Sequence, residues 1–123
     1  MVIGCAVLVI MSGLSDITMQ TASAALDGLS HRARVRADNI ANAETPGYRA
    51  REVDFEAALR AASDAPRSAR VEESYRANAV DARGNSVDLE IEVTEMVQDN
   101  LMVQAMVNGF NYKVGLLRSA MGN

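Results

Sequence analysis

Side chains that could carry out acid–base or nucleophilic chemistry are scarce in this sequence. His31 is the only histidine and Cys5 the only cysteine among the 123 residues. A single thiol allows no disulfide within the chain, and one histidine with one cysteine is too few for a zinc site. His31 adjoins Arg32 and is better explained as a solvated helix residue than as a base. We therefore predict that the protein is not an enzyme and has no catalytic residues, no metal site and no cofactor.

Two groups of charged residues could instead bind ions. An acidic group lies at Asp88, Glu90, Glu92 and Glu95, and a basic group at Arg32, Arg34 and Arg36. The acidic group could bind a cation, but helix capping and a solvated helix face explain it better. The basic group could contact phosphate, but a mixed-charge helix face is the better interpretation in an acidic chain. Neither group therefore predicts a binding site for a small molecule.

The composition favours packed helices and argues against nucleic acid as a partner. Twelve Lys+Arg against 16 Asp+Glu give a net charge of −4, whereas nucleic-acid-binding domains are normally basic. Hydrophobic residues make up 49% of the chain and aromatic residues only 4%. An apolar content dominated by Ala, Val, Leu and Met suits helix packing. The length allows at most one small domain.

Residues 1–14 form an apolar N-terminal extension. It is too short to span a bilayer, which takes about 20 residues. It resembles the apolar part of a signal peptide, but no basic residue precedes it. A third interpretation is a misassigned start, with translation beginning at Met11 or Met19. The three interpretations, an export segment, a membrane anchor and a misassigned start, stay open here.

Residues 15–48 are predicted to contain a long helix and the turn that ends it. Apolar positions at alternating spacings of three and four mark one helix face, broken once by Arg36: Met19, Ala22, Leu26, Leu29, Ala33 and Ile40. Ser15 and Asp16 could cap its start. Pro46 and Gly47 must end it, because the residue before a proline is displaced from helical geometry.

Residues 86–123 are predicted to form a second long helix with a stronger stripe. Its positions repeat with the same spacing: Leu89, Val93, Met96, Asn100, Val103, Val107, Phe110, Val114, Leu117 and Met121. A second apolar row runs beside it, so the apolar face is too wide for one partner helix. We expect an assembly interface on the two stripes, at Leu26, Leu29, Val103, Val107, Phe110, Val114 and Leu117.

The middle segment, residues 49–85, is polar and rich in Arg, Ala and Ser. A short helix is predicted near residues 54–62, capped by Asp54. Elsewhere apolar residues are sparse, so we expect loop or disorder with one hairpin at most.

The predicted fold is mainly α. Two long terminal amphipathic helices pack as an antiparallel coiled-coil hairpin, joined by a short and largely irregular middle segment. A lone hairpin buries too little surface to offset its ordering entropy, so assembly is expected. The alternative is an independently folded bundle in which the middle supplies a third helix.

The end of the first helix carries a specific signature: Asn39, Ile40, Ala41, Asn42, Thr45, Pro46, Gly47 and Tyr48. An ordinary helix stop predicts Pro-Gly but not the whole string. It resembles the N-terminal signature shared by flagellar rod, hook and hook-associated proteins. Members with a hook or distal-rod role carry a large β-rich domain between their terminal helices, and the short middle segment leaves no room for one. The resemblance is therefore to the small proximal-rod proteins. Of two such proteins, the chain resembles one more than the other.

This resemblance implies a structural subunit of the proximal rod that assembles by helix packing and transmits torque from motor to hook. It implies several copies per rod, with other rod proteins and the adapter protein FliE as neighbours. It also implies a periplasmic location, reached through the flagellar type III export apparatus without a cleaved signal peptide. No nucleic acid or small-molecule substrate is implied. The alternatives are the other small proximal-rod protein and a generic coiled-coil adaptor.

Overall fold

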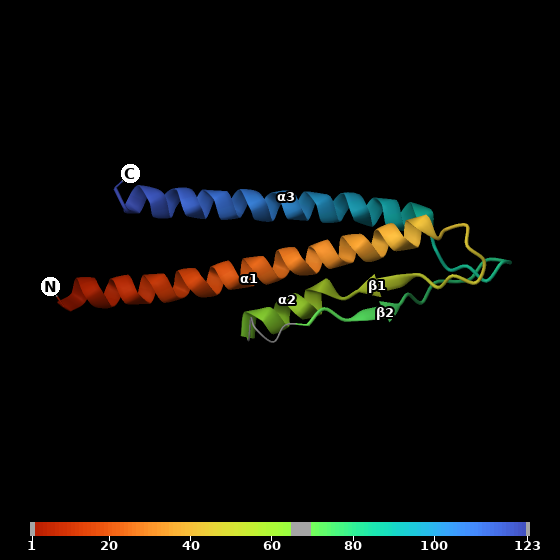
Figure 1. Cartoon of the computed structure of the whole chain (residues 1–123), viewed down its shortest axis with the longest axis horizontal. Coiled ribbons are helices and arrows are strands. Elements are labelled where there is room, and N and C mark those ends of the chain that lie inside the picture. Colours follow the sequence, from red (N-terminus) through yellow and green to blue (C-terminus); the bar gives the residue numbers. More distant parts are fainter. Residues whose placement is uncertain (1, 65–69, 123) are drawn as a thin grey trace.

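The structure is a computed structural model that describes residues 2–64 and 70–122. Along these ranges the elements are α1 (Val2–Ala41), β1 (Arg51–Val53), α2 (Phe55–Asp64), β2 (Glu73–Tyr75) and α3 (Leu89–Ala120). The two terminal helices run antiparallel, and the middle segment lies against α1 (Figure 1). The predicted mainly α fold, with long terminal helices and a short middle, is confirmed.

Helix α1 begins at Val2 rather than near Ser15 and ends at Ala41. The apolar extension contains no proline and is rich in residues that a helix accepts, so the helix continues through it. Ser15 and Asp16 are consequently interior helix residues and not caps. The 40 residues of this helix correspond to a length of roughly 60 Å.

Helix α3 begins at Leu89 rather than at residue 86, and its N-cap is Asp88. The Asp88 carboxylate accepts a hydrogen bond from the Ile91 amide at 3.2 Å. The Ser86 hydroxyl instead accepts from the amide of Ala50 at 2.8 Å and so joins the approach to α3 to the middle segment.

The middle segment is more ordered than its composition suggested. Strands β1 and β2 pair antiparallel, with Arg51 opposite Tyr75. Helix α2 is capped by Asp54, whose carboxylate accepts from the Ala57 amide at 2.8 Å. Phe55 is 2% exposed and completes a core cluster with Ala25 and Leu29 of α1. The middle segment therefore contributes to the core together with α1, in addition to the predicted short helix.

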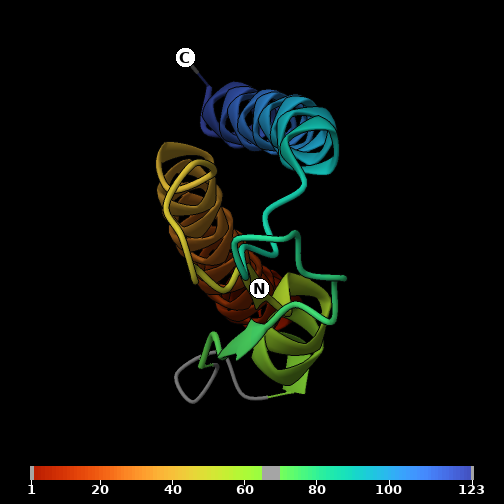
Figure 2. The same cartoon turned by 90° about the vertical axis from the view of Figure 1, so that its right-hand side faces the viewer.

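The core cluster lies where α2 and α3 pack on the middle of α1, and the loops meet at one end of the molecule (Figure 1). The terminal helices approach each other at that end and diverge toward the termini (Figure 2). Within the described ranges, every α3 residue beyond Asp99 is at least partly exposed. None of the described helices is long and apolar enough to cross a membrane.

Candidate assembly interface

The signature residue Asn39 is a fully buried junction between three elements. Its side-chain nitrogen donates to the carbonyl oxygen of Arg51 at 2.7 Å and to Glu92 Oε1 at 2.9 Å. Its side-chain oxygen accepts from the Arg51 amide at 3.0 Å and from the Tyr48 hydroxyl at 3.2 Å. The carboxamide thus uses both its donors and its acceptor to join α1, β1 and α3.

Asn85 holds the turn that follows α1. Its side-chain nitrogen lies within hydrogen-bonding distance of three backbone carbonyls, those of Asn42 at 2.9 Å, Ala43 at 3.0 Å and Thr45 at 2.7 Å. All three carbonyls lie in the turn directly after α1, so one side chain holds that turn. This role of Asn85 was not predicted from the sequence.

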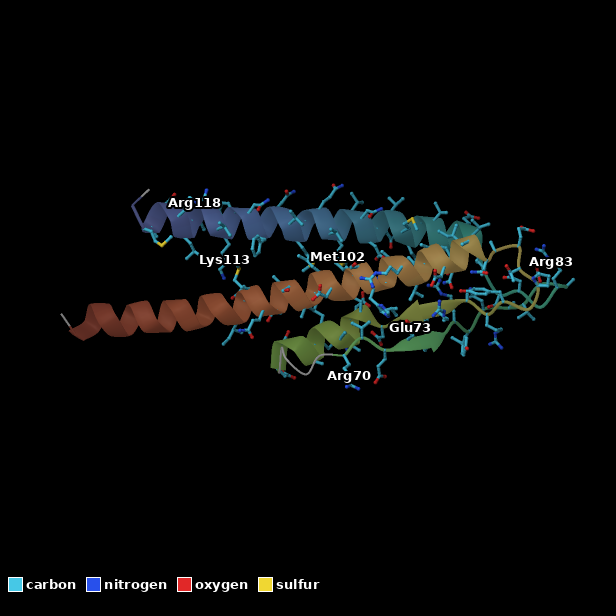
Figure 3. The ribbon with its side chains drawn as sticks, viewed as in Figure 1. Arg70, Glu73, Arg83, Met102, Lys113 and Arg118 are labelled. Carbon is cyan, nitrogen blue, oxygen red and sulfur yellow. The ribbon has the colours of Figure 1, made fainter. Side chains whose placement is uncertain are left out.

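The remaining signature residues shape the turn itself. Thr45 and Pro46 are exposed, and Ile40 is half-buried. Gly47 has a φ of +73°, a conformation that favours glycine, and its amide donates to the carbonyl of Arg83 at 2.9 Å. Arg83 lies at the tip of the molecule (Figure 3) and donates to Glu44 at 2.7 Å. The signature therefore produces a fixed turn rather than a reactive centre.

A line of polar and charged residues joins α1 to α3 beside this turn. We call it the ionic seam: Arg32, Arg36 and Asn39 of α1 with Glu92, Glu95 and Asp99 of α3. Asp99 accepts from the Nε atoms of Arg32 at 3.1 Å and Arg36 at 2.7 Å. Both arginines are 8% exposed, and Asp99 is 5% exposed.

The burial of the ionic seam corrects two expectations. Arg32 and Arg36 do not belong to a solvated face, and only Arg34 of the basic group is exposed. Glu92, at 1% exposure, is likewise not a solvated or capping residue. No group of acidic, histidine or cysteine residues within the described ranges is arranged to hold a metal ion.

The middle segment extends the ionic seam. Arg76 donates to Glu95 Oε2 at 2.6 Å, and Arg36 donates to the same oxygen. Burial alone would raise the pKa of Glu95, but these two hydrogen bonds outweigh it and hold the pKa below its ordinary value. Arg32 also lies 4.9 Å above the ring of Phe55, which links the seam to the apolar core.

His31 is half-buried rather than freely solvated. Its Nε2 lies 2.8 Å from Glu73 Oε1, so it ties α1 to β2. Glu73 is labelled in Figure 3 on the strand pair below α1. A structural contact therefore accounts for the histidine.

The expected interface residues are only partly brought together. Leu29 is 1% exposed in the core, and Val103 packs against that cluster. Leu26 and Val114 are half-buried. The other three are among the exposed hydrophobic residues of α3: Val107 at 40%, Phe110 at 37% and Leu117 at 37%. The α3 stripe thus remains largely open to solvent.

Nearer the loops, the α3 stripe turns away from α1 altogether. An exposed row at four-residue spacing, the outer row, consists of Leu89, Val93, Val97 and Leu101. A seven-residue repeat drifts by about 20° per heptad on a straight helix, which amounts to roughly 80° over four heptads. The apolar stripe therefore faces α1 in the C-terminal half of α3. Near the loops, the α3 residues of the ionic seam face α1 instead.

Comparison with known proteins defines the class to which this fold and turn belong. Residues 19–49, which include the ionic-seam arginines and the turn signature, match the family described as flagella basal body rod protein. The chain is 33% identical over 118 residues to the flagellar basal body rod protein FlgB of Aeromonas hydrophila, covering 80% of this chain and 88% of that protein. It is 28% identical over 121 residues to FlgB of Bacillus subtilis (strain 168), covering 85% of this chain and 92% of that protein.

The chain belongs to the FlgB family of flagellar basal body rod proteins. It is a structural subunit of the rod. The predicted resemblance to the flagellar axial proteins is confirmed, and the alternative that it represents FlgC, the other small proximal-rod protein, is not favoured.

Proposed function

We propose that this rod subunit assembles with other rod components through the open stripe of α3, and that helix packing transmits torque from motor to hook. The observation that carries the proposal is the exposure of Val107, Phe110 and Leu117 along one helix. A contiguous exposed apolar surface on a soluble chain marks an interaction site. A neighbouring helix laid on this stripe would remove that surface from water.

The proposed interface comprises the residues expected from the sequence: Leu26, Leu29, Val103, Val107, Phe110, Val114 and Leu117. Leu29 and Val103 anchor the stripe to the subunit's own core. The exposed members belong to the C-terminal half of α3, where α1 and α3 diverge (Figure 1). A helix from another copy or from another rod protein would fill that space, which supports a mechanical role without chemistry.

The finer assignments in this proposal rest on family membership. We propose further copies of this chain, other rod proteins and the adapter protein FliE as its neighbours in the basal body. We also propose a periplasmic rod location, export by the flagellar type III apparatus without a cleaved signal peptide, and no enzymatic activity or cofactor.

Val107→Asp tests the interface. The substitution should abolish motility, because assembly would bury a carboxylate without a partner. Val107 is 40% exposed in the free subunit, so the variant should retain its fold, as measured by circular dichroism. The matched control is Asn108→Asp, at an exposed neighbouring position. Normal swimming by the Val107→Asp strain would contradict the proposed interface.

A further inference from the structure

The contacts of the ionic seam share one antiparallel register. Three of its pairs across the two helices define this register: Asn39 with Glu92, Arg36 with Glu95, and Arg32 with Asp99. The same register continues into the core, where Ala25 falls opposite Met106, a residue that packs against the core cluster. A single alignment therefore satisfies the polar and the apolar contacts together.

Apolar contacts alone would not select this alignment. Beyond Asp99, α3 offers an apolar side chain on nearly every turn, including Met102, Val103 and Met106. Methionine is flexible and fills spaces of different shape. Near the loops, a rotation of α3 about its axis would bury Leu89 and Val93 of the outer row, which are 46% and 47% exposed. Hydrophobic burial thus permits more than one register and more than one rotation.

The polar contacts discriminate among these arrangements. A slip of α3 by one heptad in one direction sets Arg32 and Arg36 opposite Met106 and Met102. Both arginines then lose Asp99, and Arg36 also loses Glu95, whereas Arg32 keeps only Glu56 of α2, which lies 3.1 Å from its Nη1. A buried charge without its partner is strongly destabilising. The opposite slip draws Asn85 into the seam and away from the three carbonyls that it serves. Of these three alignments, only the observed one preserves both the ion pairs of the seam and the contacts of Asn85 with the three carbonyls.

The ionic seam is not optimised for stability. Replacing a buried ion pair by apolar residues is often neutral or stabilising. Two buried atoms, Arg76 Nε and Glu92 Oε2, lack a hydrogen-bond partner in the described structure. Selection of one alignment explains such a cluster better, because buried polar groups can specify register at the expense of stability.

We propose that the ionic seam is an alignment lock, which fixes the register of α3 on α1 and holds the outer row of α3 outward. Arg32, Arg36 and Asp99 are its positioning residues. The lock acts within one chain, so it can be tested without rod assembly, and its failure is distinguishable from failure of the proposed interface.

Disulfide trapping in the purified chain, with Cys5→Ser as background, reads out the register. The pair Ala25→Cys and Met106→Cys reports the observed alignment. The pair Ala25→Cys and Lys113→Cys reports a slip of one heptad. With the native seam, only the first pair should oxidise. Formation of both disulfides to a similar extent, or failure of the first, would overturn the proposal.

The same two cysteine pairs are then placed in a chain with an apolar seam: Arg32→Leu, Arg36→Leu, Glu92→Leu and Asp99→Leu. Loss of the lock should raise the ratio of slipped to observed disulfide at least about tenfold. Arg34→Leu, at an exposed position, is the matched control and should leave the ratio unchanged. A helical apolar-seam chain that forms only the observed disulfide would disprove the lock.

A milder pair of variants decides the question if the apolar-seam chain loses its helicity. Asp99→Asn removes the charge that both arginines share and should increase the slipped disulfide. Asp99→Glu restores the charge and should bring the ratio back toward the native value. An Asp99→Asn chain with the native ratio would show that the charge does not select the register.

Discussion

The Asn39 side chain donates to Glu92 Oε1 across 2.9 Å, and the two residues are 0% and 1% exposed. One belongs to the turn signature that marks the flagellar axial family, and the other to the ionic seam between the terminal helices. The contact makes the signature part of the helix pairing rather than a separate loop. The rod subunit's turn and its hairpin are therefore expected to be disrupted together.

Replacing Asn39 with Ala should lower the free energy of unfolding by about 2–3 kcal/mol, because it leaves buried hydrogen-bonding groups of Arg51 and Glu92 without partners. Urea denaturation of the purified chain measures the change. Asn108→Ala, at an exposed position of α3, should alter stability by no more than about 0.5 kcal/mol. Equal effects at the two positions would argue against the junction role of Asn39.

Glu95 should make part of the stability pH-dependent. Hydrogen bonds from Arg76 and Arg36 outweigh the effect of burial and hold its folded-state pKa below the ordinary value of 4.5. Because the folded pKa is depressed, the contribution is fully present above the unfolded pKa and is lost as pH falls through the folded pKa. The stability difference between the native chain and Glu95→Gln should therefore shrink between pH 7 and pH values below that folded pKa. A constant difference, measured by denaturation at each pH, would contradict this.

Glycine-to-alanine substitutions should change thermal stability differently in the open part of α3 and in the packed part of α1. A Cβ at Gly109 or Gly115 meets no atom within 4 Å, so alanine should gain close to its full helix propensity of about 1 kcal/mol. At Gly28 the added Cβ would lie 3.1 Å from Phe55 Cδ2, so the gain there should be smaller or absent. Thermal denaturation followed by circular dichroism ranks the three variants. A larger gain at Gly28 than at Gly109 would be inconsistent with the packing described.

Hydrogen exchange should reveal a gradient along α3. Amides from Glu92 to Asp99 lie where the ionic seam holds the helix, and should exchange slowly. Amides from Val107 to Leu117 belong to the part where every side chain is at least partly exposed, and should exchange faster in the free subunit. Uniform protection along the helix would indicate that its open end is already packed in the isolated chain.

Local signals in the sequence were sufficient to predict the two terminal helices and the turn between them. Pro46 and Gly47 force the first helix to end before them. The heptad spacing of α3 is sustained along its length. The cap at Asp54 was equally local. The boundary of α1 was misplaced because Ser15 and Asp16 form a plausible cap, yet nothing in the preceding residues stops a helix.

The ionic seam could not be predicted because it depends on how α3 is rotated about its own axis relative to α1, and only tertiary packing fixes that rotation. The heptad stripe placed Leu89 and Val93 toward α1, whereas the drift of that repeat on a straight helix brings Glu92 and Asp99 there instead. Phe55 was not predicted as a core residue, because nothing local in the sequence shows that its ring packs on Ala25 and Leu29 of α1. The role of Asn85 requires three carbonyls that lie far away in sequence.

The most direct test of the central claim is the composition of purified basal bodies from a strain whose own gene is replaced by a tagged version. The native chain should be recovered in the rod, whereas the Val107→Asp chain should be absent from it while it remains helical in solution. Recovery of the Val107→Asp chain in rods at the native amount would contradict assembly through the open stripe of α3, and absence of the native chain from basal bodies would contradict its role as a rod subunit.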